Sequence, residues 1–151
     1  MCFISITRLR VKSFISLPRF FVANEASIKV LIQTRGFVEG KELVDKNLTF
    51  WTMTMWEAEN NMKEFRNSLP HRKAMQKLPD WCDEASYLHW MQEEKVLPDW
   101  QTAYEKMITE GKTTKVRFPS ANQINKDYQP IKWTKSERML LPKARMNKKS
   151  N

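Results

Sequence analysis

A run of seven uncharged residues, Phe50–Trp56, is the most distinctive feature of the hydrophobic pattern along the chain. Both alternating faces of this run are bulky and mostly apolar, so the polar face of a half-exposed strand is missing. A strand with such a pattern is normally covered on both sides. The pattern therefore predicts a fully buried strand inside a sheet.

A broken helix is predicted to follow, because polarity changes abruptly at Glu57 and apolar residues then recur at helical spacing. Pro70 is tolerated in the first turn of a helix but not in its interior. We therefore expect Ser68 to cap a second helical piece over residues 69–78. His71 lies in the first turn of that piece, where unpaired backbone N–H groups gather.

The remaining pattern completes a ferredoxin-like order of elements. A helix is predicted from Leu17 to a stop at Arg35-Gly36, and strands are predicted at Phe3–Lys12, Phe37–Asp45 and Tyr87–Gln92. The order is β-α-β-β-α-β, which indicates an α+β fold with two helices on one face of the sheet.

The pattern changes past Glu94. A further helix is expected at about residues 98–110, followed by a short strand at Lys115–Phe118. We assign residues 1–118 to one ferredoxin-like domain that includes this added helix. Residues 119–151 contain three prolines and no regular period, which predicts an extended basic tail that is partly or wholly disordered.

The predicted sheet has one face without helices, and its buried strand indicates that this face is apolar. A large apolar sheet face cannot remain in water. The sequence offers no second sheet to cover it, so a second copy of the chain is the simplest partner. We therefore expect a homodimer joined sheet to sheet, which is a dimeric α+β barrel.

Charge and cysteine content narrow the class of protein. The net charge of +9 is concentrated in residues 119–151, where eight Lys/Arg face two Asp/Glu. This tail lacks the interleaved aromatic residues of a base-stacking surface, so no specific nucleic-acid partner is expected. The two cysteines, Cys2 and Cys82, are too few for a disulfide framework, which indicates free thiols in the cytoplasm.

Several classes of site and segment are absent from the sequence. No run of about eighteen apolar residues is present, so no transmembrane segment is expected. The chain has no phosphate-binding loop, no dinucleotide-binding glycine motif, and no Ser-His-Asp or Cys/His metal-binding spacing.

Five segments in order resemble an uncharacterised bacterial family that is grouped with spheroidene monooxygenase. This family lies within the dimeric α+β-barrel superfamily that includes antibiotic-biosynthesis monooxygenases, and the likeness covers about residues 3–120. The segments are ITRLRVKS (6–13), GFVEGKEL (36–43), FWTMTMWE (50–57), FRNSLPHRKAM (65–75) and WCDEA (81–85).

The resemblance implies a monooxygenase-like protein that holds an apolar molecule, such as a polyene or polycyclic compound, between the sheet and the helices. It also implies haem as a candidate cofactor, with His71 as its ligand. Haem-degrading relatives present an axial histidine near the position of Met75, so His71 is the nearest comparable ligand here. Without haem, His71 would be a catalytic base, and Arg66 and Asn67 would orient the substrate.

Other interpretations stay open at this stage. The pocket is expected to be lined by Trp51, Met53, Phe65 and Met75, although most of the tryptophans and methionines would simply be core. The alternative interpretation of His71 is a histidine that only caps a helix. His89 is expected to be a structural residue within a strand. The alternatives to an enzyme are a non-catalytic module that binds haem or another apolar ligand, and a structural protein with a filled cavity.

Overall fold

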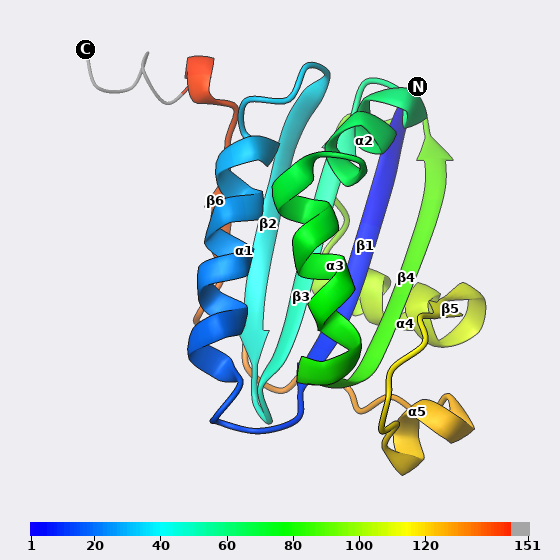
Figure 1. Ribbon diagram of the computed structural model, residues 1–151. Helices are drawn as coiled ribbons and strands as arrows, with labels where there is room; N and C mark the ends of the chain where they lie inside the picture. Colours follow the sequence, from blue (N-terminus) through cyan, green and yellow to red (C-terminus); the bar gives the residue numbers. More distant parts are fainter. Residues whose placement is uncertain (146–151) are drawn as a thin grey trace.

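The computed structural model describes residues 1–145 as one six-stranded antiparallel sheet with helices on both faces (Figure 1). The strands lie in the order β5-β4-β1-β3-β2-β6. The elements in chain order are β1 (Cys2–Val11), α1 (Leu17–Leu31), β2 (Phe37–Asp45), β3 (Thr49–Trp56), α2 (Glu59–Arg66), α3 (Leu69–Trp81), β4 (Cys82–Gln92), α4 (Trp100–Glu110), β5 (Lys112–Thr113), α5 (Ala121–Asn125) and β6 (Arg138–Leu140).

The four central strands confirm the predicted ferredoxin-like α+β fold. β3 lies between β1 and β2, and all three pairings of the central sheet are antiparallel. Trp51 and Trp56 of β3 are fully buried, on opposite faces of the strand. The uncharged run at residues 50–56 is therefore an interior strand, as its two apolar faces predict.

One side of the sheet, here called the helical face, is covered by α1, α2 and α3 (Figure 1). Strand residues alternate between the two faces, so Phe3 and Leu9 of β1 and Phe50 and Trp56 of β3 point toward these helices. The helices contribute buried apolar side chains in return, which are Phe20, Leu31, Met62 and Leu78.

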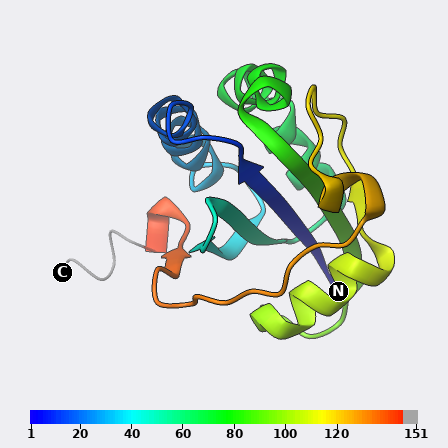
Figure 2. The ribbon, with the colours of Figure 1, turned by 90° about the horizontal axis from the view of Figure 1, so that it is seen from below.

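The opposite side, here called the C-terminal face, is covered by α4 and by the segment that runs beneath the sheet from α5 to β6 (Figure 2). Its core joins strand residues to Trp100, Ala103 and Met107 of α4 and to Tyr128 of the segment. The strand residues of this core include Ile4, Ile6, Leu43, Trp51, Met53, Met55 and Leu88. The chain therefore covers with its own residues the face that the sequence analysis left bare.

The described part of the predicted tail, residues 119–145, differs from an extended arm. It forms α5 and β6, and Tyr128 and Leu140 are 4% exposed. Tyr128 packs in the core of the C-terminal face and Leu140 in the core of the helical face, and such long-range contacts cannot be read from local composition. The predicted tail also includes residues 146–151, which lie outside the described residues. The division of the chain at residue 118 stays a prediction.

Two element boundaries also differ from the sequence prediction. β4 begins at Cys82 rather than at Tyr87, because α3 continues past Pro79 to Trp81 and leads directly into the strand. The strand predicted at Lys115–Phe118 is irregular chain, and the two-residue β5 pairs with β4 instead. No helix among residues 1–145 is long and apolar enough to cross a membrane.

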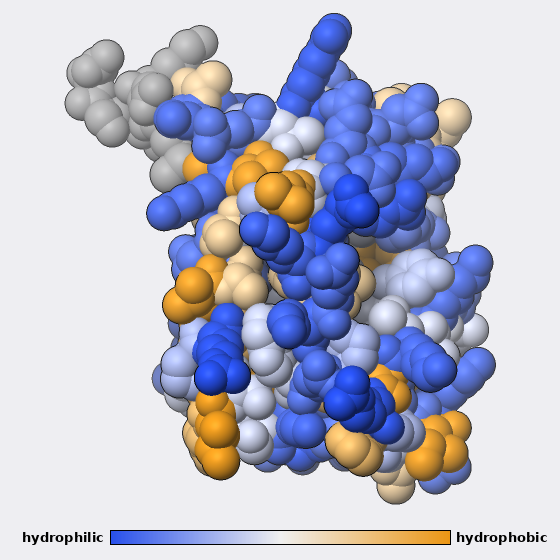
Figure 3. Space-filling model, in the orientation of Figure 1, coloured by the Kyte–Doolittle hydropathy of each residue, from blue (hydrophilic) through white to orange (hydrophobic). Residues whose placement is uncertain are grey.

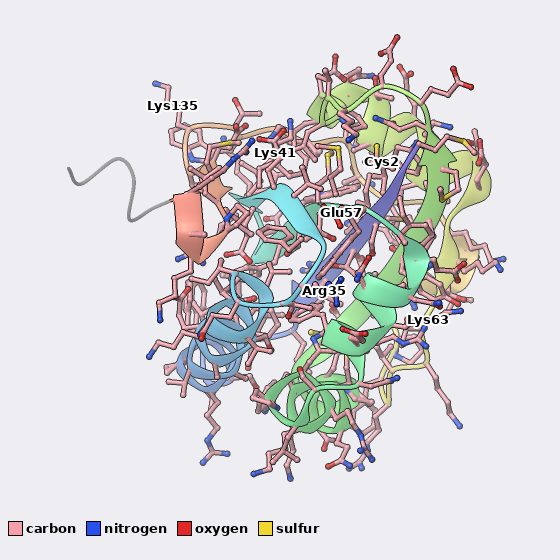
Figure 4. The ribbon with its side chains drawn as sticks, turned by 90° about the horizontal axis from the view of Figure 1, so that it is seen from above. Cys2, Arg35, Lys41, Glu57, Lys63 and Lys135 are labelled. Atoms are coloured by element: carbon pink, nitrogen blue, oxygen red, sulfur yellow. The ribbon has the colours of Figure 1, made fainter. Side chains whose placement is uncertain are left out.

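Figure 4 looks along the sheet from the end that carries α2 and separates the two layers of helices. Arg35 and Glu57 lie at this end, where the backbone N–H of Glu57 donates to the carbonyl of Gly36. Gly36 has a φ of +81°, and an added Cβ would lie 2.2 Å from Cγ of Asn61. The glycine therefore lets the start of α2 pack closely against the end of α1.

The opposite end of the sheet carries the tight turn between β2 and β3. Residues 46–48 connect the paired residues Asp45 and Thr49, and within them Asn47 and Leu48 have φ values of 62° and 57°, in the left-handed region. Asn tolerates this conformation, whereas it is uncommon for a bulky side chain such as Leu. The carbonyl of Leu48 accepts the N–H of Val11, which fixes the turn against the end of β1.

Candidate functional site

A cavity of about 280 Å³ lies between the helical face of the sheet and helices α1, α2 and α3. This volume is just below the usual range for small-molecule pockets, which is about 300–1,000 Å³. The floor of the cavity is formed by polar side chains at alternate positions of three strands, which are Ser5, Thr7, Thr52, Thr54, Tyr87 and His89.

The walls of the cavity are apolar. Each of the three amphipathic helices turns an apolar stripe of side chains toward the sheet. Where these side chains do not contact the sheet, they enclose the cavity. The wall residues are Phe20, Ile28, Leu31, Met62, Phe65, Met75, Leu78 and Trp81. The space-filling view of this side shows mostly hydrophilic side chains on the outer surface, so the apolar lining lies behind it (Figure 3).

His71 reaches the cavity from the first turn of α3. Its ring lies 4.7 Å from the ring of Phe65, centroid to centroid. Burial, and secondarily the positive charge of Arg66, lower the pKa of His71 to about 4. The imidazole is therefore neutral at pH 7, and it makes no side-chain hydrogen bond with any residue from 1 to 145.

His89 reaches the same cavity from β4. Its ring lies 5.3 Å from the ring of Phe3 and 5.3 Å from the ring of Tyr87. Burial, followed by the charge of Arg66, lowers the pKa of His89, and Glu59 acts in the opposite direction. Two neutral imidazoles therefore face one apolar cavity.

Arg66 is the cationic group that the two histidines share. It ends α2, lines the cavity and is exposed on its outer side. It makes no ion pair with another residue of the described chain. A cation that lowers the pKa of two imidazoles would equally stabilise negative charge on a ligand between them.

Polar side chains near α1 and β2 are held in place by Glu42 of β2, which is 5% exposed. Nδ2 of Asn24 donates to both carboxylate oxygens at 3.1 Å, and the hydroxyl of Thr52 donates at 3.3 Å. Nη2 of Arg138 adds an ion pair at 3.0 Å. Asn24 and Thr52 also line the cavity, so this network fixes two polar groups at its wall.

The structure brings together some of the predicted site residues. Phe65, Arg66, His71 and Met75 line the cavity. The side chain of Asn67 is exposed and outside the lining.

Trp51 and Met53 do not line the cavity either. They belong to the core of the C-terminal face, because the inward positions of β3 toward the helices are the even ones.

Sequence reasoning missed His89 and Tyr87 as residues of the site. The signal was present in the parity of β4, since residues at positions 87 and 89 share a face. That face could be assigned only through the pairing of Thr7 with Tyr87 and of Ser5 with His89, which requires the sheet.

Haem fits this cavity poorly. A four-pyrrole macrocycle exceeds a space of about 280 Å³. A histidine that binds a metal almost always donates its second N–H to an acceptor, and His71 has no such acceptor among residues 1–145. We therefore derive no chemical step through haem.

Comparison of the chain with known proteins identifies its fold but not its activity. No protein-family model matches the chain, and no curated protein matches it either. Solved structures do match, and SnoaB, a cofactor-independent oxygenase from Streptomyces nogalater, is 13% identical with a TM-score of 0.51. That match covers 65% of this chain and 98% of SnoaB.

Two further structures give the same result. An antibiotic biosynthesis monooxygenase matches with a TM-score of 0.54 at 6% identity, over 61% of this chain and 99% of its own. A conserved protein from Methanosarcina mazei Go1 matches with a TM-score of 0.55 at 10% identity, over 62% and 94%. The chain therefore has the ferredoxin-like fold of the antibiotic-biosynthesis-monooxygenase-like proteins, with about a third of its length outside each match.

Proposed function

We propose that this chain is a monooxygenase-like enzyme that needs no cofactor and acts on an apolar small molecule in the cavity between the sheet and helices α1–α3. The observation that carries the proposal is the pair of neutral imidazoles, His71 and His89, facing one apolar cavity beside the cation of Arg66. The fold that the chain shares with a cofactor-independent oxygenase supports it.

An oxygenase of this kind requires a substrate that supplies the electrons itself. A methylene group flanked by aromatic rings and a carbonyl is acidic enough to be deprotonated by a base in a site that stabilises the anion. The carbanion adds O₂ to give a peroxide, and loss of water from that peroxide leaves a new carbonyl. One oxygen atom then ends in the product and the other in water, so no external reductant is required.

His71 is the proposed base. Its imidazole is neutral at pH 7 and can accept a proton, although a pKa of about 4 makes it a weak base in the empty cavity. A substrate anion beside the ring would raise that pKa, since an opposite charge favours the protonated form. Arg66 is placed to stabilise the same anion.

The second candidate function is a non-catalytic module that binds an apolar ligand. The low pKa of His71 favours this alternative, because the best catalytic bases have a pKa near the working pH. A polyene substrate and the relation to spheroidene monooxygenase also stay proposals, as does assembly into a homodimer.

Oxygen consumption separates the two functions. The full chain is mixed with anthrone, a tricyclic ketone with an activated methylene group, and dissolved O₂ is followed with an electrode. We expect uptake of one O₂ per anthrone, and a loss of about 10²-fold or more in rate for His71→Gln, as for removal of a general base. Quenching of tryptophan fluorescence measures binding of anthrone independently.

The outcomes are distinct. Binding without oxygen uptake would establish the binding module and overturn the enzyme. Unchanged turnover in His71→Gln together with a loss of turnover in His89→Gln would identify His89 of β4 as the base instead. A matched control is Gln76→Ala, which changes an exposed residue of α3 outside the cavity lining and should leave both readouts unchanged.

A further inference from the structure

A second cavity, of about 290 Å³, opens on the C-terminal face at the end of the sheet that carries the β2–β3 turn. It lies between the strand ends and the chain that leaves α5, which passes beneath the sheet in Figure 2. In contrast to the first cavity it is lined by polar and charged residues. These include Arg8, Arg10, Asp45, Lys46, Asn47, Glu84, Ser120, Asn122, Gln129 and Lys132.

A buried ion pair forms part of its wall. Arg8 is 2% exposed and Glu84 is 1% exposed, and Nη1 of Arg8 lies 2.5 Å from Oε2 of Glu84. The guanidinium carbon of Arg8 also lies 4.6 Å from the ring centre of Tyr128 and 5.8 Å from that of Trp51. Desolvation opposes the burial of both ions, and their mutual attraction and hydrogen bond offset this cost while holding the guanidinium at this position.

The two carboxylates in the lining of the cavity already accept hydrogen bonds from the protein. Asp45 accepts the backbone N–H groups of Lys46, Lys132 and Trp133 at 2.8–3.0 Å. Glu84 accepts from Arg8 and from the hydroxyl of Ser120. Both carboxylates of the lining are therefore satisfied by the protein.

The cations of the lining are not all satisfied. Nε of Arg8 has no hydrogen-bond partner, and only Nη1 of its guanidinium donates within residues 1–145. Lys46 and Lys132 make no ion pair within the same residues. A cavity with satisfied carboxylates and unsatisfied cations is complementary to an anion.

We propose that this second cavity binds a small phosphorylated molecule, with Lys46 and Lys132 on the phosphate and the guanidinium of Arg8 beneath it. Several cations around one space require a ligand with more than one negative charge, and a phosphate group carries about −1.5 to −2 at pH 7. Lysine acts on a phosphate as a point charge. Nη1 of Arg8 donates to Glu84 and its Nε is buried, so Arg8 adds positive charge beneath the site rather than a forked contact.

The site is independent of the proposed oxygenase chemistry. The strand residues that line it, Arg8, Asp45 and Glu84, point to the C-terminal face, and those that line the first cavity point to the helical face. Binding at one site can therefore fail without any consequence for the other. Its roof comes from residues beyond α4, outside the ferredoxin-like unit of β1 to β4.

Isothermal titration of the full chain with inorganic pyrophosphate tests the proposal. At a fixed, near-physiological ionic strength we expect saturable binding of one pyrophosphate per chain. The double substitution Lys46→Gln with Lys132→Gln should weaken this binding by about tenfold or more, because two charge-assisted contacts are lost. Both lysines are exposed, so the variant should fold normally.

The control must separate a built site from the general attraction of a chain with net charge +9. Lys73→Gln with Lys77→Gln removes the same two charges from the exposed surface of α3. This pair should change the affinity by less than about twofold. Equal losses in both double variants, or no saturable binding at millimolar pyrophosphate, would overturn the proposal.

Discussion

Burial determines the protonation state of single side chains on the helical face of the sheet. His71 and His89 stay neutral because charging them would cost desolvation in an apolar cavity. Burial also raises the pKa of the Cys82 thiol to about 12, with Asp83 contributing in the same direction. Cys82 is therefore a protonated core residue, and we expect it to react slowly with thiol reagents in the folded protein.

The first prediction concerns stability at low pH. The pKa of His71 is about 4 when folded and 6.5 when unfolded, so the unfolded chain binds more protons between these values. Above pH 6.5 the free energy of unfolding carries almost no penalty from His71, and it falls as the pH decreases toward 4. Between pH 7 and pH 5 the His71 contribution amounts to about 2 kcal/mol. Urea unfolding at the two pH values should show this loss, added to those of other groups.

His71→Gln provides the control, because it removes the titrating group while keeping a polar side chain. The variant should lose about 2 kcal/mol less than the wild type over the same pH interval. An identical loss of unfolding free energy in both proteins would show that His71 titrates normally and that water reaches its imidazole.

The second prediction concerns the buried ion pair between Arg8 and Glu84. Glu84→Gln leaves a guanidinium buried without its counter-charge, so we expect a loss of about 3–5 kcal/mol in the free energy of unfolding. Replacing both partners, as Arg8→Met with Glu84→Leu, should recover much of that loss. Denaturant titration of the wild type and of these two variants measures both effects, and equal destabilisation by the single and double changes would contradict the argument.

At the scale of elements, the local sequence pattern predicts an element correctly where the residues that determine it lie within the element itself. The interior position of β3 followed from two apolar faces, and the break between α2 and α3 followed from Pro70 with Ser68 before it. The start of β4 could not be predicted, because Pro79 indicates a helix end, yet α3 continues through it to Trp81. Pro79 cannot donate to the carbonyl of Met75, one turn earlier, yet only two residues of α3 follow it before β4 begins.

The third prediction tests how α5 is attached to the sheet. Gln123 is 7% exposed, and its amide accepts from the N–H of Ala85 and donates to the carbonyl of Ala85 and to that of Thr114. Gln123→Ala would remove the acceptor of the buried N–H of Ala85 and of the hydroxyl of Tyr128, whereas the carbonyl of Ala85 keeps the N–H of Thr114. We expect a loss of about 1–3 kcal/mol, measured by thermal unfolding.

Hydrogen exchange adds a local readout to this test. The amide of Ala85 should exchange much faster in Gln123→Ala than in the wild type, since its acceptor is lost. The exposed residue Asn125 of the same helix offers a control, and Asn125→Ala should leave exchange at Ala85 unchanged. Unchanged protection in Gln123→Ala would show that water replaces the side chain.

At the scale of the whole molecule, the limits of sequence reasoning lie in long-range packing. The sequence predicts a cavity between sheet and helices, and the structure has one there, lined by Phe65, Arg66 and His71 of α2 and α3. Trp51 and Met53 were assigned to it wrongly, since the face of a strand residue depends on the register of the whole sheet. His89 was missed for the same reason.

The covering of the C-terminal face also changes the argument for assembly. The predicted homodimer rested partly on an apolar sheet face with nothing to cover it. In the structure Ile4, Ile6 and Met53 are fully buried within one chain, under α4 and the segment that contains Tyr128. The hydrophobic need for a second copy at this face is thereby removed, and the dimer stays a prediction drawn from resemblance.

The last prediction follows from this covering. If one chain buries both sheet faces, its folding should not depend on protein concentration, whereas an obligate dimer becomes more stable as concentration rises. We therefore expect the thermal midpoint of the full chain to stay constant from about 1 to 100 μM. The control is a chain shortened after Phe118, which loses Tyr128 and exposes the apolar face. That chain should unfold at a lower temperature and associate, as light scattering would show. A midpoint of the full chain that rises with concentration would establish instead that the fold requires a second copy.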